Sequence, residues 1–129
     1  MPGIFEELRV WQEARKLAKE IYMLTDAFPA NEMYGITGQM RRAAVSVMSN
    51  IVEGQGRFSK QEFVRFLFIA RGSLMEVNSL CILAGDLELI SSVELEYISG
   101  HCDKIGKMIN VLISKTQLQI KNQKDKGII

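Results

Sequence analysis

Apolar side chains recur three or four positions apart along almost the whole 129-residue chain, with polar residues between them. This spacing is the period of an α-helix, and no segment shows the strict alternation that indicates a half-buried β-strand. The only prolines are Pro2 and Pro29, so little interrupts the helical pattern. The sequence therefore predicts an all-α protein.

Four helices are expected, over about residues 5–27, 36–53, 59–90 and 92–118. Pro29 ends the first, because the residue before a proline is pushed out of the helical region. Gly54 is expected to cap the second. The polar end of the chain, residues 119–129, is expected to fray.

Capping boxes mark the starts of the last two helices. Ser59 with Glu62, and Ser91 with Glu94, have the spacing in which a serine and a glutamate satisfy each other's backbone amides. Short loops join all four helices, so residues 1–129 should form one antiparallel up-down-up-down bundle.

Two cysteines test the register of the last two helices. Cys81 lies ten residues before Ser91 and Cys102 lies eleven after it, so both should lie at one level of the bundle. Reduced thiols that pack as small apolar groups are the expected state.

The third expected helix carries a second apolar stripe. Val64, Phe68, Met75 and Ile82 lie about 100° to 140° away from the main apolar row that begins at Phe63. A wide inward face accounts for part of this excess. Burying each large side chain is nonetheless worth about 1.5–3 kcal/mol, which favours a homo-oligomer that covers this stripe.

The second expected helix carries a polar row, formed by Arg42, Ser46, Ser49 and Glu53. Arg42 and Glu53 are about 16 Å apart along the helix axis, too far to pair with each other. Their partners are expected on the third helix, at Arg57 in the turn, or on a neighbouring subunit. The candidate interface or partner-binding residues are therefore Arg41, Arg42, Ser49, Asn50, Glu53, Gly54, Gly56, Arg57, Arg65, Phe68, Met75 and Glu76.

Charge weakens the case for nucleic-acid binding. Sixteen Lys and Arg residues face fifteen Asp and Glu residues, a net charge of +1, whereas nucleic-acid-binding domains are usually strongly basic. The alternative is that Arg41, Arg42, Arg57 and Arg65, repeated around an oligomer, bind RNA phosphates. Self-association is favoured because the local basic excess is small.

No catalytic, cofactor-binding or metal-binding set is recognisable, so the protein is not expected to be an enzyme. A di-iron site needs two Glu-x-x-His pairs, and the chain has the single histidine His101. Zinc held by Cys81, Cys102 and His101 would lack a fourth ligand. The turn at Gly54 and Gly56 is not a Walker loop, and His101 is expected to be solvated.

The N-terminus lacks the basic and apolar regions of a secretory signal, and two cysteines are too few for a disulfide framework. Charged or polar residues interrupt the apolar stretches before about 18 residues, so no membrane span is expected. These features favour a cytoplasmic protein.

Three groups of residues carry a family resemblance that extends over about Leu8 to Leu89. They are Gln39, Arg41, Arg42 and Ala43; Ser49, Asn50, Ile51, Glu53, Gly54, Gly56 and Arg57; and Ser59, Glu62, Phe63, Phe66, Leu67, Ala70, Gly72, Ser73, Leu74 and Glu76. In these positions the chain resembles the four-helix-bundle family of 23S rRNA-intervening-sequence proteins.

The resemblance implies an antiparallel four-helix bundle that assembles into a ring-shaped homopentamer. It also implies that some relatives are encoded inside insertions of bacterial 23S rRNA genes, and it supplies no active site. Members often have proline where this chain has Met48, so a kink expected there in the family is in doubt here.

Overall fold

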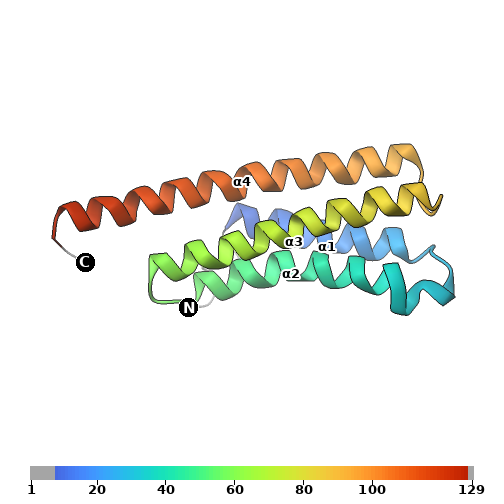
Figure 1. Cartoon of the computed structure of the whole chain (residues 1–129), viewed down its shortest axis with the longest axis horizontal. Coiled ribbons are helices and arrows are strands. Elements are labelled where there is room, and N and C mark those ends of the chain that lie inside the picture. The colour runs from blue at the N-terminus through green and yellow to red at the C-terminus, as the bar shows by residue number, and fades with distance from the viewer. Residues whose placement is uncertain (1–7, 128–129) are drawn as a thin grey trace.

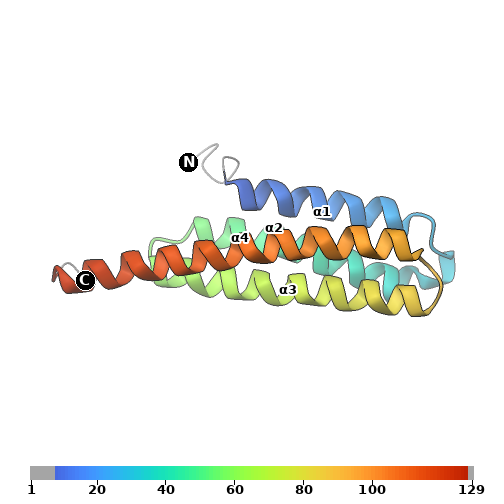
Figure 2. The ribbon, with the colours of Figure 1, turned by 90° about the horizontal axis from the view of Figure 1, so that it is seen from above.

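The computed structural model describes residues 8–127, which form four long helices that run alternately in opposite directions (Figure 1). They are α1 (Arg9–Thr25), α2 (Gly38–Gln55), α3 (Lys60–Asp86) and α4 (Ser92–Asp125). Seen from above, α1 and α4 lie side by side, and α4 extends past the other helices at its C-terminal end (Figure 2). The predicted all-α fold is confirmed.

The core lies between the four helices and is made of the predicted apolar rows. Its largest fully buried side chains include Leu17, Ile21, Met40, Ile51, Leu67, Ile105 and Ile109. Each comes from a position that repeats at helical spacing, which is why the pattern of the sequence predicts the core well.

The end of α4 corrects the expected helix boundary. The helix continues to Asp125, whereas fraying was expected after residue 118. Thr116 is buried and Ile120 is partly buried against the core. These contacts, with Lys and Gln as good helix formers, extend the helix into the polar segment.

Gly54 corrects the expected end of α2. It lies inside the helix, which continues to Gln55 and has Gly56 as its C-terminal cap. The Gly56 amide donates to the Val52 carbonyl at 3.0 Å. Gly54 is buried because α3 crosses there, and a Cβ atom at Gly54 would lie 2.7 Å from Phe66 Cβ. The glycine therefore permits close packing of two helices.

The chain reversals are longer than expected. Between α1 and α2 lie a 3₁₀ turn, η2 (Ala30–Glu32), and a π turn, η3 (Met33–Thr37), with non-helical backbone at Gly35. The start of α1 near residue 5 lies outside the described residues. At the other reversal α3 ends at Asp86, and Glu88 adopts a φ of 60°. Beyond these turns α2 runs unbroken through Met48.

One of the two predicted capping boxes is complete. Ser91 Oγ accepts from the Glu94 amide at 3.1 Å, and the Glu94 carboxylate accepts from the Ser91 amide at 2.8 Å. Ser59 Oγ accepts from the Glu62 amide at 3.1 Å, but the Glu62 carboxylate accepts from Arg65 at 3.0 Å instead of returning to Ser59. The predicted hydrogen bond from the Ser59 amide to the Glu62 carboxylate is therefore wrong.

Cys81 and Cys102 are both buried and free. Burial raises the pKa of Cys81 to about 11. Burial, with the charges of Cys81 and Glu20, raises the pKa of Cys102 to about 12. They stay protonated and pack as small apolar groups.

Candidate association surface

The outward side of α3 carries an exposed apolar stripe. Its large side chains are Phe68, Ile69, Met75, Ile82 and Leu83, which are 40% to 68% exposed. The opposite side of the helix supplies the core residues Leu67, Leu74 and Val77. Val64, expected in the exposed stripe, is buried instead. α3 is therefore apolar on two sides, and one of them faces solvent in a single copy.

The apolar composition of α3 also makes it similar to a membrane-spanning helix. Within the described part of the chain, α3 is the one helix long and apolar enough to cross a membrane, and a third of its most apolar window is buried. Charged residues interrupt its apolar stretches at Arg65, Arg71 and Glu76, as expected, and the helix passes this test by overall length and composition only. Its inward row packs in the bundle, whereas the outward stripe is largely exposed, with the Arg71 guanidinium 4.7 Å from the centre of the Phe68 ring.

A polar row on α2 lies beside this stripe and partly joins α2 to α3. The hydroxyl groups of Ser46 and Ser73 are 2.8 Å apart. Asn50 donates to the Ser46 carbonyl at 2.8 Å and to the Ser46 hydroxyl at 3.0 Å. Arg42 and Ser49 are exposed along the same side of α2. We call the α3 stripe and this exposed row the association surface.

The two glutamates of the predicted site are both exposed. Glu53 accepts from Arg57 at 2.5 Å, one helical turn away, and Glu76 stands on the outward side of α3. A carboxylic acid that acts in proton transfer usually lies in a water-poor cleft that shifts its pKa. Neither residue is enclosed in that way.

The four predicted arginines do not form one patch on a single copy. Arg41 donates to Thr25 at 2.9 Å and lies 4.6 Å from the centre of the Tyr22 ring, so it fastens α2 to the end of α1. Arg57 and Arg65 lie at the opposite end of α2, where each stacks on Phe66. About 16 residues of helix, or about 24 Å, separate Arg41 from that end.

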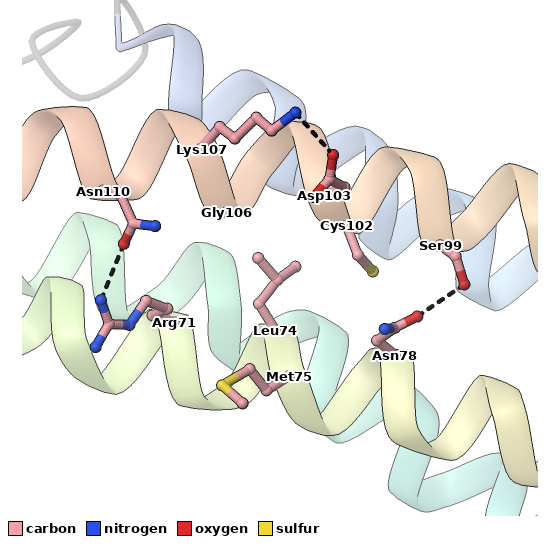
Figure 3. A pocket seen from close by; sticks show the side chains of 10 residues that line it. All are labelled: Arg71, Leu74, Met75, Asn78, Ser99, Cys102, Asp103, Gly106, Lys107 and Asn110. Atoms are coloured by element: carbon pink, nitrogen blue, oxygen red, sulfur yellow. Dashed lines mark hydrogen bonds and ion pairs between the residues drawn. The ribbon is translucent and has the colours of Figure 1, made fainter.

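A cleft of about 420 Å³ between α3 and α4 borders the association surface (Figure 3). Arg71 donates to Asn110 at 2.9 Å, and Ser99 donates to Asn78 at 2.8 Å, so two hydrogen bonds cross the cleft. Gly106 leaves room above Leu74. These groups are already paired with each other and join the two helices.

A polar cluster between α1 and α4 was missed by sequence analysis. His101 on α4 contacts two α1 carboxylates: Nδ1 lies 2.6 Å from Glu20, and Nε2 lies 3.0 Å from Glu13. The His101 side chain is only 11% exposed, so the expected solvated histidine is wrong. The ring donates to both carboxylates only when both nitrogens carry a hydrogen.

Two more α4 residues complete this cluster. Tyr97 donates to Glu20 at 2.6 Å, and Lys104 lies 3.3 Å from Glu13. The hydrogen bond to Glu20 raises the pKa of the Tyr97 phenol. The cluster could have been suspected from Glu13 and Glu20, which lie seven residues apart and so share one side of α1.

Burial alone would raise the pKa of Glu13. Hydrogen bonds from His101, Lys16 and Lys104 outweigh it and lower the pKa from 4.5 to about 2. Charge-assisted hydrogen bonds of this kind stabilise the ionised form. The cluster therefore holds an ionised carboxylate between two helices.

Glu13 should give the protein an acid-sensitive stability. Its pKa is lowered on folding, so its contribution is present above about pH 4.5 and is lost as the pH falls toward 2. We expect a loss on the order of 1–3 kcal/mol in the free energy of unfolding over this range. Urea unfolding at several pH values should show that the free energy of unfolding falls less between pH 4.5 and 2 for Glu13→Gln than for the wild type. Glu96→Gln, at an exposed position of α4, should keep the wild-type pH dependence.

No group of three or more His, Cys, Asp or Glu residues within residues 8–127 is arranged to hold a metal ion. Several of the polar groups described above bind one another between helices, as Ser46 and Ser73 and the His101 cluster do.

Three comparisons with known proteins bear on this fold. A family model described as 23S rRNA-intervening sequence protein matches residues 6–111. No curated protein matches the chain. A solved structure from Bacteroides thetaiotaomicron, described as a protein of unknown function from the S23 ribosomal protein family, is similar with a TM-score of 0.73 and 22% identity over 81% of this chain and 97% of that one.

Proposed function

Because the chain belongs to the 23S rRNA-intervening sequence protein family, we propose that it is a non-enzymatic protein that assembles with copies of itself into a ring-like homopentamer. The observation that carries this proposal is the exposed apolar stripe of α3. A cytoplasmic location fits the two free thiols in the core.

The exposed stripe of α3 is large enough for its burial to favour association. Full burial of one large apolar side chain is worth about 1.5–3 kcal/mol, whereas association costs on the order of 4–15 kcal/mol in lost freedom. A single residue cannot offset that cost. The five side chains of the stripe are 40% to 68% exposed, so each has about half of that value left to gain, and only their joint burial against a partner can offset the cost. The polar row of α2 beside them would set the register of the contact.

A ring also requires a second, different patch on each copy, because head-to-tail contacts are what close a ring. An apolar depression of about 470 Å³ lies on the α1 and α4 side of the bundle and supplies a candidate. Its apolar lining is Met23, Leu24, Val93, Tyr97 and Ile98. α3 and α1 lie on opposite sides of α4 when the bundle is seen from above (Figure 2).

Phe68→Glu should break the assembly. A charge within a desolvated apolar contact has no partner, so we expect the mass in light scattering to fall from five copies of the 14.6 kDa chain toward one. Tyr34→Glu is the matched control, since Tyr34 is 98% exposed in the turn before α2. A monomeric wild type, or a Phe68→Glu variant of unchanged mass, would refute the proposal.

A further inference from the structure

The outward side of α1 is basic. Arg9, Arg15, Lys16 and Lys19 are all exposed, with Gln12 between them. At 100° per residue these five positions fall within a sector about 120° wide, opposite the buried row of the helix. Among residues 8–127, Arg9, Arg15 and Lys19 have no carboxylate within ion-pairing distance.

The acids of α1 balance only part of this charge, because Glu13 pairs with Lys16 at 3.2 Å and with Lys104 at 3.3 Å. Glu13 and Glu20 turn toward α4, where their side chains are 14% and 25% exposed and bind His101. The acidic and basic residues of α1 alternate along the sequence but lie on different sides of the folded helix. Basic groups lie outward, and the acids lie in the helix interface.

α4 continues the same basic side. Lys104, Lys107 and Lys115 are exposed and lie within about 80° of one another on α4. Lys107 and Lys115 line one depression together with the α1 residue Arg9, and Lys107 is paired with Asp103 at 3.1 Å. Lys104 contacts the α1 residue Glu13, so the two basic helices are neighbours, as Figure 2 shows.

The surface of α1 is also hollowed at its basic groups. A depression of about 370 Å³ is lined by Gln12, Arg15, Lys16 and Lys19. The Arg15 guanidinium lies 5.6 Å from the centre of the Trp11 ring, an arrangement that restrains the cation through its attraction to the ring face. Three cations and one amide around a single depression can contact successive phosphate groups of one chain.

We infer that this basic side of α1 and α4 binds the phosphate backbone of a nucleic acid without reading its sequence. Backbone recognition needs only exposed cations along a surface, and it supplies affinity by releasing counterions. A basic helix that binds membranes inserts an apolar face, but the apolar face of α1 is packed in the core. The inference does not rest on self-assembly, and its basic residues are distinct from the α3 stripe and from the lining of the apolar depression of α1 and α4.

Charge reversal tests the inference. Anisotropy titrations of labelled RNA and duplex DNA, each about 20 nucleotides long, would be done with the full chain at about 50 and 200 mM salt. We expect wild-type binding that weakens steeply with salt, and a double variant Arg15→Glu with Lys19→Glu that binds at least about tenfold more weakly, with a salt slope smaller by about 2.

The control is the double variant Arg57→Glu with Arg65→Glu, which makes the same change of net charge near the turn between α2 and α3, at two arginines that pair with Glu53 and Glu62. It should bind as the wild type does. Circular dichroism and light scattering must show that both variants keep the wild-type fold and mass, so that a failure of assembly is recognised as such. The inference is overturned if the wild type does not bind at low salt, if both double variants weaken equally, or if only vesicles rich in anionic lipid are bound.

Discussion

Gly54→Val is expected to lower the free energy of unfolding by about 2–4 kcal/mol. A Cβ atom at this position would lie 2.7 Å from Phe66 Cβ and 3.0 Å from Phe63 Cδ1. Phe66 Cβ is attached directly to the α3 backbone and cannot swing away by a change of rotamer. α2 and α3 must then move apart along a contact that both helices use for the core.

A graded series separates this steric effect from helix propensity. At an open helix position alanine is about 1 kcal/mol better than glycine. Gly100 is such a position, because a Cβ atom there meets nothing within 4 Å. Gly100→Ala should therefore stabilise the protein and Gly54→Ala should destabilise it, in urea unfolding at one fixed protein concentration. A Gly54→Ala variant as stable as Gly100→Ala would show that the helices do not approach so closely.

His101→Ala is expected to cost about 2–4 kcal/mol of unfolding free energy. It removes the group that lies between Glu13 and Glu20, and it leaves two poorly solvated carboxylates facing a cavity between α1 and α4. Losing one partner of a partly buried carboxylate is costly, although Glu13 keeps Lys16 and Lys104 and Glu20 keeps the Tyr97 hydroxyl group.

The surface pair of Lys107 and Asp103 provides the control. The Lys107 amine lies 3.1 Å from the Asp103 carboxylate, and both side chains are well exposed. Such surface pairs contribute about 0–1 kcal/mol to stability. Lys107→Ala should therefore change the stability little. In a double-mutant cycle, His101→Ala in a Glu20→Gln background should cost less than in the wild type. An equal loss of unfolding free energy in the two backgrounds would mean that the contact of His101 with Glu20 does not stabilise the packing of α1 on α4.

Features that depend on neighbours in the chain were predicted well. The helical period, the Ser91 capping box and the break at Pro29 involve residues a few positions apart, and their geometry follows from the backbone itself. The exposed positions of Phe68 and Met75 could also be expected, because each lies on the far side of a helix whose core row is clear from its spacing.

Features that depend on how two helices meet were predicted poorly. Gly54 has the composition of a helix cap, but the crossing of α3 makes it an interior contact. His101 has no suitable partner near it in sequence, and its partners Glu13 and Glu20 are 88 and 81 residues away. A local sequence pattern carries no information about contacts between residues so far apart in the chain.

The sequence by itself determined the all-α class, the antiparallel order of the helices and the second apolar stripe of α3, because helical period and loop length are local quantities. Only the tertiary structure decided which charges reach the surface. It turned Glu13 and Glu20 of α1 inward onto α4 and left Arg15 and Lys19 outward. A chain with a net charge of +1 thereby acquires a basic side, since the packing of α1 on α4 separates charges that sequence counting places together.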